Sequence, residues 1–125
     1  MKKMRPNIHC FVVIITAYAR QGTVEGVEKA EQILNQMEKQ VLDGRFAFEI
    51  NNYAYNVVMD AIGSTNKDAT KVEAIFERMK ALADERNLPD LQPDVISYTA
   101  LMKAWIAEEK PGFATKVENL LEEME

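Results

Sequence analysis

The residues of this chain that could do chemistry are few. The single histidine, His9, stands beside the single cysteine, Cys10. Neighbouring residues of a helix do not face each other, and no second His or Cys pair exists to complete a zinc site. His9 therefore predicts a surface side chain rather than a catalytic or metal-binding one. A lone cysteine cannot form an internal disulfide, which fits a reducing compartment or an organelle matrix.

The carboxylates near the C-terminus are the other candidates for chemistry. Four glutamates stand there: Glu118, Glu122, Glu123 and Glu125. Paired carboxylates need a pocket for acid–base catalysis, and the pattern predicts a solvated helix face instead. No phosphate loop, dinucleotide-binding turn or nucleophile elbow occurs. We expect no enzyme, no cofactor and no small-molecule substrate.

Length and charge exclude further classes. The 125 residues allow one domain, and 47% hydrophobic residues predict a folded chain. The net charge of −5 argues against generic binding to DNA or to a membrane surface. The longest apolar stretch, residues 10–19, is about half as long as a membrane-spanning helix. The first residues resemble neither a secretory signal nor a transit peptide, so we expect a soluble chain.

Three apolar ladders, each opening on an aromatic residue, predict three helices. Each occupies positions 0, 3, 4 and 7, which lie on one helical face. They are Phe11, Ile14, Ile15, Tyr18; Tyr55, Val58, Met59, Ile62; and Tyr98, Leu101, Met102, Trp105. A second ladder with the same spacing follows each: Ala30, Ile33, Leu34, Met37; Val72, Ile75, Phe76, Met79; and Val117, Leu120, Leu121, Met124. The sequence therefore predicts three copies of a two-helix unit, at about residues 6–49, 50–92 and 93–125.

Helix boundaries agree with the ladders. An N-cap residue stands four positions before each aromatic residue: Asn7, Asn51 and Asp94. A turn or C-cap glycine falls between the two ladders of each unit: Gly22, Gly63 and Gly112. An isolated helical hairpin cannot bury both ladders, so we expect an all-α fold, an α-α superhelix of stacked hairpins. Neither end carries a polar cap, and we expect a fragment or a short array that stacks on a neighbour.

The repeated pattern resembles the pentatricopeptide repeat (PPR) family. The resemblance runs through residues 93–102 (PDVISYTALM) and 117–124 (VENLLEEM), and the first-helix pattern returns at 6–8 with Phe11 and at 55–60 (YNVVMD). It covers essentially the whole chain three times. The copies are longer than the family's usual unit, and the extra residues fall mainly between repeats. The tetratricopeptide pattern is absent.

The resemblance implies binding of single-stranded RNA in mitochondria or chloroplasts, with one base addressed per repeat. Two polar positions would read the base: the residue after the first-helix aromatic and the cap residue of the next repeat. In the second repeat these are Asn56 and Asp94, a pair that in the family favours uracil. An amide beside a carboxylate presents both donor and acceptor to a pyrimidine edge.

The other recognition positions follow from the same resemblance. In the third repeat the residue after the aromatic is Thr99, which in the family favours a purine. The cap residue that would pair with it would lie beyond Glu125. Val12 pairs with Asn51, but valine has no polar group to read a base edge, so no base is predicted there. Asn7 would complete a repeat that precedes this chain.

Base stacking and phosphate contacts are also implied by the resemblance. The residues two positions before the aromatics would stack on bases: His9, Tyr53 and Ile96. Arg20 matches a cation that contacts phosphate in the family, whereas Ser64 and Ala107 stand at the equivalent positions. Phosphate contacts supply most of the affinity of such proteins, so this scarcity counts against RNA binding.

Two functions remain open. The first is an RNA-binding module for organellar RNA processing, stability or translation, which Asn56, Asp94 and Thr99 favour. The second is a scaffold for protein partners in a larger assembly such as an organellar ribosome, which Val12 and the weak phosphate set favour. Each polar residue also has a structural reading: Asp94 caps a helix in any such repeat, and Tyr53 could cover the surface between repeats.

Overall fold

The computed structural model describes residues 7–45, 50–65, 68–108 and 112–124, and these contain helices but no strand. The helices are α1 (Ile8–Ala19), α2 (Val24–Leu42), α3 (Tyr53–Thr65), α4 (Ala69–Arg86), the 3-10 turn η1 (Pro89–Leu91), α5 (Val95–Glu108) and α6 (Phe113–Met124). The predicted all-α class is confirmed. The repeat limits inferred from the sequence stay a prediction.

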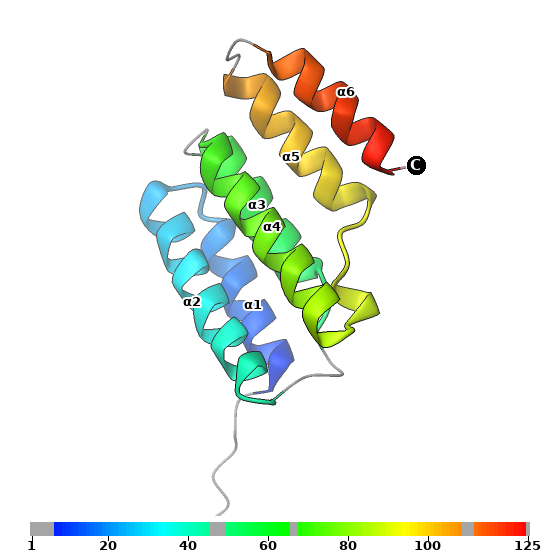
Figure 1. Ribbon diagram of the computed structural model, residues 1–125. Coiled ribbons are helices and arrows are strands. Elements are labelled where there is room, and N and C mark those ends of the chain that lie inside the picture. Colours follow the sequence, from blue (N-terminus) through cyan, green and yellow to red (C-terminus); the bar gives the residue numbers. More distant parts are fainter. Residues whose placement is uncertain (1–6, 46–49, 66–67, 109–111, 125) are drawn as a thin grey trace, which may run out of the picture.

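Three antiparallel helix pairs stack in chain order (Figure 1). Within the pairs, α1 packs on α2, α3 on α4, and α5 on α6. Between the pairs, α3 contacts both α1 and α2, and α5 contacts both α3 and α4. The first helices α1, α3 and α5 thus form one row, and this row carries the residues that the sequence predicts to recognise RNA.

The apolar ladders are buried where a neighbouring pair covers them. Val58 and Leu101 are 0% and 1% exposed, whereas Ile14, at the same ladder position in α1, is 43% exposed. At the other end Leu121 is 54% exposed, although the equivalent Phe76 is 1% exposed. Burial therefore follows the stacking of pairs rather than the pattern within one pair, as in other repeat proteins.

Two of the three predicted caps lie where the sequence places them. The Asn7 side chain accepts a hydrogen bond from the Cys10 amide at 3.0 Å, and Asp94 accepts one from the Ser97 amide at 3.0 Å. The third is displaced by one residue. Helix α3 begins at Tyr53, so Asn52 occupies the cap position, and Asn51 accepts the Tyr53 amide from further out.

Asn52 is held at that position by the loop before α5. Its backbone amide donates to the Asp90 carbonyl at 3.0 Å, and its side-chain amide donates to the Gln92 carbonyl at 2.8 Å. These two long-range bonds tie the start of α3 to the η1 turn. The sequence pattern around the aromatic residue does not contain this contact, which explains the one-residue error.

The expectation that Gly63 forms a turn is wrong, because it lies inside α3. A Cβ built there would lie 3.8 Å from the Cβ of Ala104, an ordinary van der Waals contact, so the packing of α5 does not require a glycine at this position. The other two predicted glycines do lie at turns, with φ of 67° at Gly22 and 86° at Gly112. Both angles are in the left-handed region that favours glycine.

Polar contacts also join neighbouring pairs. The buried Tyr55 hydroxyl donates to Glu38 at 2.7 Å, and Glu38 pairs with Arg78 at 3.0 Å. Burial, together with the nearby Glu38 carboxylate, raises the pKa of Tyr55 far above its ordinary value. At the next interface Lys80 pairs with Glu123 at 2.5 Å. At the first interface the acidic residue belongs to the earlier pair and the basic residue to the later one. At the second interface the basic residue belongs to the earlier pair.

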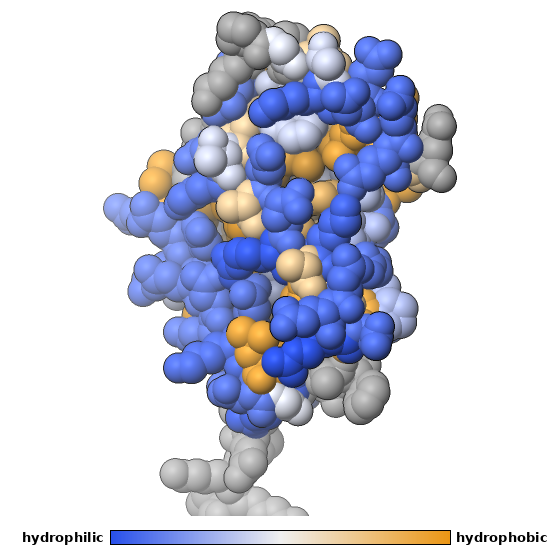
Figure 2. Space-filling view, in the orientation of Figure 1, coloured by the Kyte–Doolittle hydropathy of each residue, from blue (hydrophilic) through white to orange (hydrophobic). Residues whose placement is uncertain are grey.

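The face on which α4 lies in front of α3 is largely hydrophilic, with scattered apolar residues (Figure 2). A hydrophilic outer face is expected for helices whose inner sides are covered and whose outer sides meet water. None of the helices in the described ranges is long and apolar enough to cross a membrane.

The stacking of helix pairs predicts how a truncated side chain at the α3–α5 interface affects stability. Leu101→Ala should lower the free energy of unfolding by about 2–5 kcal/mol, because Leu101 is 1% exposed and its loss leaves a cavity. Leu121→Ala is the matched control on an exposed face and should change it by less than about 0.5 kcal/mol. Urea denaturation of both variants checks this, and equal losses would contradict the stacking.

Candidate nucleic-acid interface

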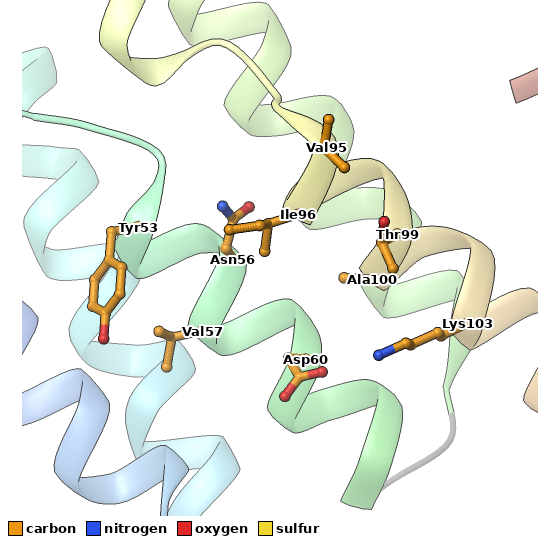
Figure 3. Close-up of a pocket in the computed structure, with 9 residues that line it drawn as sticks. All are labelled: Tyr53, Asn56, Val57, Asp60, Val95, Ile96, Thr99, Ala100 and Lys103. Carbon is orange, nitrogen blue, oxygen red and sulfur yellow. The ribbon is translucent and has the colours of Figure 1, made fainter. Parts of the chain in front are cut away.

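A cavity of about 440 Å³ lies between the first helices α3 and α5 (Figure 3). Its lining residues are Tyr53, Asn56, Val57, Asp60, Val95, Ile96, Thr99, Ala100 and Lys103. Four of them, Tyr53, Asn56, Ile96 and Thr99, are residues that the resemblance implies for stacking on or reading bases. The structure therefore brings these four to one cavity, although their roles stay predictions.

The mouth of this cavity is apolar and accessible. Tyr53 is 48% exposed, and Val95 and Ile96 are 68% and 63% exposed. Aromatic side chains are the surfaces on which unstacked bases rest in proteins that bind single strands, and Tyr53 is such a side chain. Tyr53 and Ile96 come from different helices, so a flat ligand between them would touch both repeats.

Asn56 lies in the wall of the cavity and is 6% exposed. Its Nδ2 donates to Asp94 Oδ1 at 3.3 Å, and its Oδ1 accepts a hydrogen bond from Ser97 Oγ at 2.5 Å. The two residues implied to read uracil are thus in direct contact. An amide has two N–H donors and two acceptor lone pairs, so one of each remains on Asn56 for a ligand.

Asp94 is exposed and accepts several hydrogen bonds. Burial alone would raise the pKa of its carboxyl, but hydrogen bonds from the Ser97 amide and from Asn56 outweigh burial and hold the pKa below its ordinary value. The carboxylate is therefore charged at neutral pH, and it can only accept hydrogen bonds.

Charges of opposite sign face each other across the cavity. Asp60 on α3 and Lys103 on α5 point toward one another (Figure 3). In the part of the chain that the structure describes, neither belongs to an ion pair. Lys103 therefore supplies a cation at a position that the resemblance does not single out, one helical turn before Ala107.

The groove between α1 and α3 collects most of the remaining predicted residues. His9, Val12 and Asn51 line a cavity of about 160 Å³ together with Tyr53. His9, Val12, Tyr53 and the predicted phosphate contact Arg20 line a more open hollow of about 390 Å³. The valine at position 12 occupies the place that Asn56 takes at the next groove, so this groove offers less polar contact.

Asn7 and Ser97 complete the comparison with the sequence. Asn7 caps α1 and lines none of these three cavities. Ser97 is a site residue that the sequence analysis missed. Its signal was the spacing Asp-x-x-Ser at residues 94–97, a variant of the capping box in which two residues bond each other's backbone.

The described residues hold no cluster of three or more His, Cys, Asp or Glu side chains that could bind a metal ion. Cys10 is exposed and forms no disulfide.

One curated relative covers almost the whole chain. The chain is 31% identical over 121 residues to the small ribosomal subunit protein mL103, also called rPPR7, of Arabidopsis thaliana. The similarity covers 97% of this chain and 25% of that protein, so the chain spans about a quarter of its relative's length. No protein-family model matches the chain, and no solved structure matches it. The similarity indicates a relationship to a PPR-named protein.

The hydrogen bonds of Asp94 predict a pH dependence of stability. A lowered pKa in the folded state means that the carboxylate stabilises the fold above the ordinary aspartate pKa of about 3.9, and that this stability is lost as pH falls through the folded value. Asp94→Asn keeps a cap but removes the charge. The stability advantage of the parent chain over this variant should therefore be constant near neutral pH and shrink below about pH 4.

Urea midpoints measured for both proteins from neutral to acid pH check this prediction. A difference between them that does not change with pH would show that the hydrogen bonds do not favour the charged carboxyl.

Proposed function

We propose that the chain is part of a pentatricopeptide repeat protein and binds single-stranded RNA along the groove of α1, α3 and α5. The observation that carries the proposal is the cavity between α3 and α5, which Tyr53, Asn56, Ile96 and Thr99 line together. The resemblance in sequence alone implies these four residues as contacts for bases. The similarity to rPPR7 over 97% of the chain supports the family.

One base would occupy the α3–α5 cavity. The base lies against the exposed Tyr53 and Ile96 side chains, a contact worth about 1–3 kcal/mol per base where the surface is aromatic. Its edge meets the free N–H of Asn56 in the cavity wall. The Asp94 carboxylate does not line the cavity, but it lies 3.3 Å from Asn56 Nδ2 and would supply an acceptor beside that donor. Uracil offers the complementary acceptor and donor, a carbonyl oxygen and the N3–H group.

Lys103 would neutralise a phosphate beside that base. Lys103 and Arg20 belong to successive grooves, so a strand that follows the first helices meets both cations. Asp60 faces Lys103 and weakens its field, which predicts modest affinity and a shallow salt dependence.

The proposed setting is a larger organellar assembly, in the mitochondrion or the chloroplast. The supporting observation is the relative, which is named as a ribosomal subunit protein. In that setting the chain binds and positions RNA, and we propose no catalytic role for it.

A scaffold is the second candidate function, and the same relative favours it. A ribosomal protein can use its surfaces for protein contacts alone. The exposed apolar side chains at the ends of the stack, such as Ile14 and Leu121, would suit such contacts.

Fluorescence anisotropy with labelled U-rich, A-rich and C-rich RNA across a salt series tests the proposal. RNA binding predicts salt-sensitive association with tighter binding of the U-rich strand. Asn56→Ala should reduce that preference about three- to tenfold, the factor that one lost hydrogen bond is worth, while circular dichroism stays unchanged. Flat curves at low salt for all three strands would contradict RNA binding and favour the scaffold.

Lys103→Ala should weaken binding to every strand alike and reduce the slope of log affinity against log salt by about 1, because one phosphate contact is lost. Lys29→Ala is the matched control, since it removes the same charge from an exposed position on α2. Equal effects of the two variants would mean that only the total charge matters, and that Lys103 has no special place at the groove.

A further inference from the structure

Ser97 connects the two residues of the proposed recognition pair, although it does not line the cavity. It is 0% exposed and is one of two buried polar residues in the described part of the chain, the other being Asn56. Ser97 Oγ lies 2.5 Å from Asn56 Oδ1 and 3.1 Å from the Asp94 backbone nitrogen. The Ser97 amide donates to Asp94 Oδ1 at 3.0 Å. The three residues therefore form a closed network across the α3–α5 interface.

The Ser97 hydroxyl has one hydrogen to donate. Two oxygens lie near it, Asn56 Oδ1 at 2.5 Å and Asp94 Oδ1 at 3.1 Å. The Asp94 oxygen already accepts hydrogen bonds from Asn56 Nδ2 and from the Ser97 amide. The shorter contact and the unmet acceptor both assign the hydrogen to Asn56. The hydroxyl oxygen accepts the Asp94 amide in turn.

This arrangement selects one orientation of the Asn56 amide. With the carbonyl turned to Ser97 and the amide nitrogen turned to Asp94, both contacts of the Asn56 amide join a donor to an acceptor. Rotation of the amide by half a turn would set Asn56 Oδ1 against the Asp94 carboxylate, two acceptors that repel each other. A buried polar group without a partner is unfavourable, so the network excludes the rotated form.

We propose that Ser97 is a positioning residue that fixes the Asn56 amide and thereby determines base preference at the α3–α5 cavity. The proposal rests on the proposed function. The fixed amide presents its remaining N–H next to the Asp94 carboxylate, a donor beside an acceptor. A rotated amide would present two acceptors, which do not match the alternating edge of uracil.

The neighbouring groove lacks this device. The positions equivalent to Ser97 and Asn56 are Ala54 and Val12, neither of which has a polar side-chain atom. Asn51, equivalent to Asp94, instead accepts the Tyr53 amide at 3.0 Å. The proposal therefore assigns base preference to the α3–α5 cavity and none to the α1–α3 groove.

A purely structural role for Ser97 makes a different prediction. Ser97 and Asp94 also bond reciprocally at the start of α5, as a capping box does. If that were the whole role, Ser97→Ala would lower stability like any lost cap and leave the base preference unchanged. Asp68→Ala is the matched control, since Asp68 caps α4 by accepting the Lys71 amide at 3.2 Å and takes no part in the Asn56 network.

The experiment combines two measurements on the full chain and on three variants: Ser97→Ala, Ser97→Thr and Asp68→Ala. The first is the NMR exchange rate and mobility of the Asn56 side-chain amide in the free protein. The second is the ratio of affinities for U-rich and C-rich RNA by anisotropy. Ser97→Ala should make the amide mobile and fast-exchanging and lower the U-rich preference about three- to tenfold. Ser97→Thr should restore both, and Asp68→Ala should change neither.

The outcomes separate this proposal from the proposed function. An Asn56 amide that stays rigid in Ser97→Ala, or a base preference that survives it, would overturn the positioning role. If the parent chain binds none of the RNA strands, the proposed function fails and the role in base preference fails with it. The amide measurement in the free protein would then still decide whether Ser97 holds Asn56.

Discussion

The structure depends on one constraint: each helix pair has apolar residues on both of its broad sides and must be covered on each. The middle pair satisfies this, with Val58 and Phe76 at 0% and 1% exposure. Each outer pair is covered on one side only. On the uncovered sides Ile14 and Leu121 stay exposed. Because covering requires that the pairs stack in parallel, the first helices come to lie side by side, and the groove between α3 and α5 results from this stacking.

Polar contacts between pairs refine the stacking that burial drives. The Tyr55–Glu38–Arg78 chain at one interface and the Lys80–Glu123 pair at the next have opposite orders of acid and base. A pair shifted to the wrong neighbour would therefore meet like charges, which favours one order of stacking. The register of the pairs also sets the distance between Asn56 and Asp94. These two residues belong to successive pairs and touch only when the pairs are in register.

The sequence predicted what local patterns control. Ladder spacing gave the helices, and side-chain oxygens marked the caps at Asn7 and Asp94, because helix periodicity and capping depend on a few neighbouring residues. It failed where distant residues act, since the loop contacts of Asn52 move the start of α3. It also failed at Gly63, which lies within α3 although glycine is a poor helix former. The resemblance implied four of the nine residues that line the cavity. Lys103 and Ser97 were missed because their roles arise only when α5 meets α3.

The central claim is that the cavity between α3 and α5 binds a base. The most direct measurement is an NMR titration of the labelled chain with a short U-rich RNA. The account predicts that shift changes gather at the cavity residues Asn56, Thr99 and Lys103 and along the α1–α3 groove, while the outer face of α2 and α4 stays unperturbed. Changes centred on that outer face, or none at any RNA concentration, would contradict it.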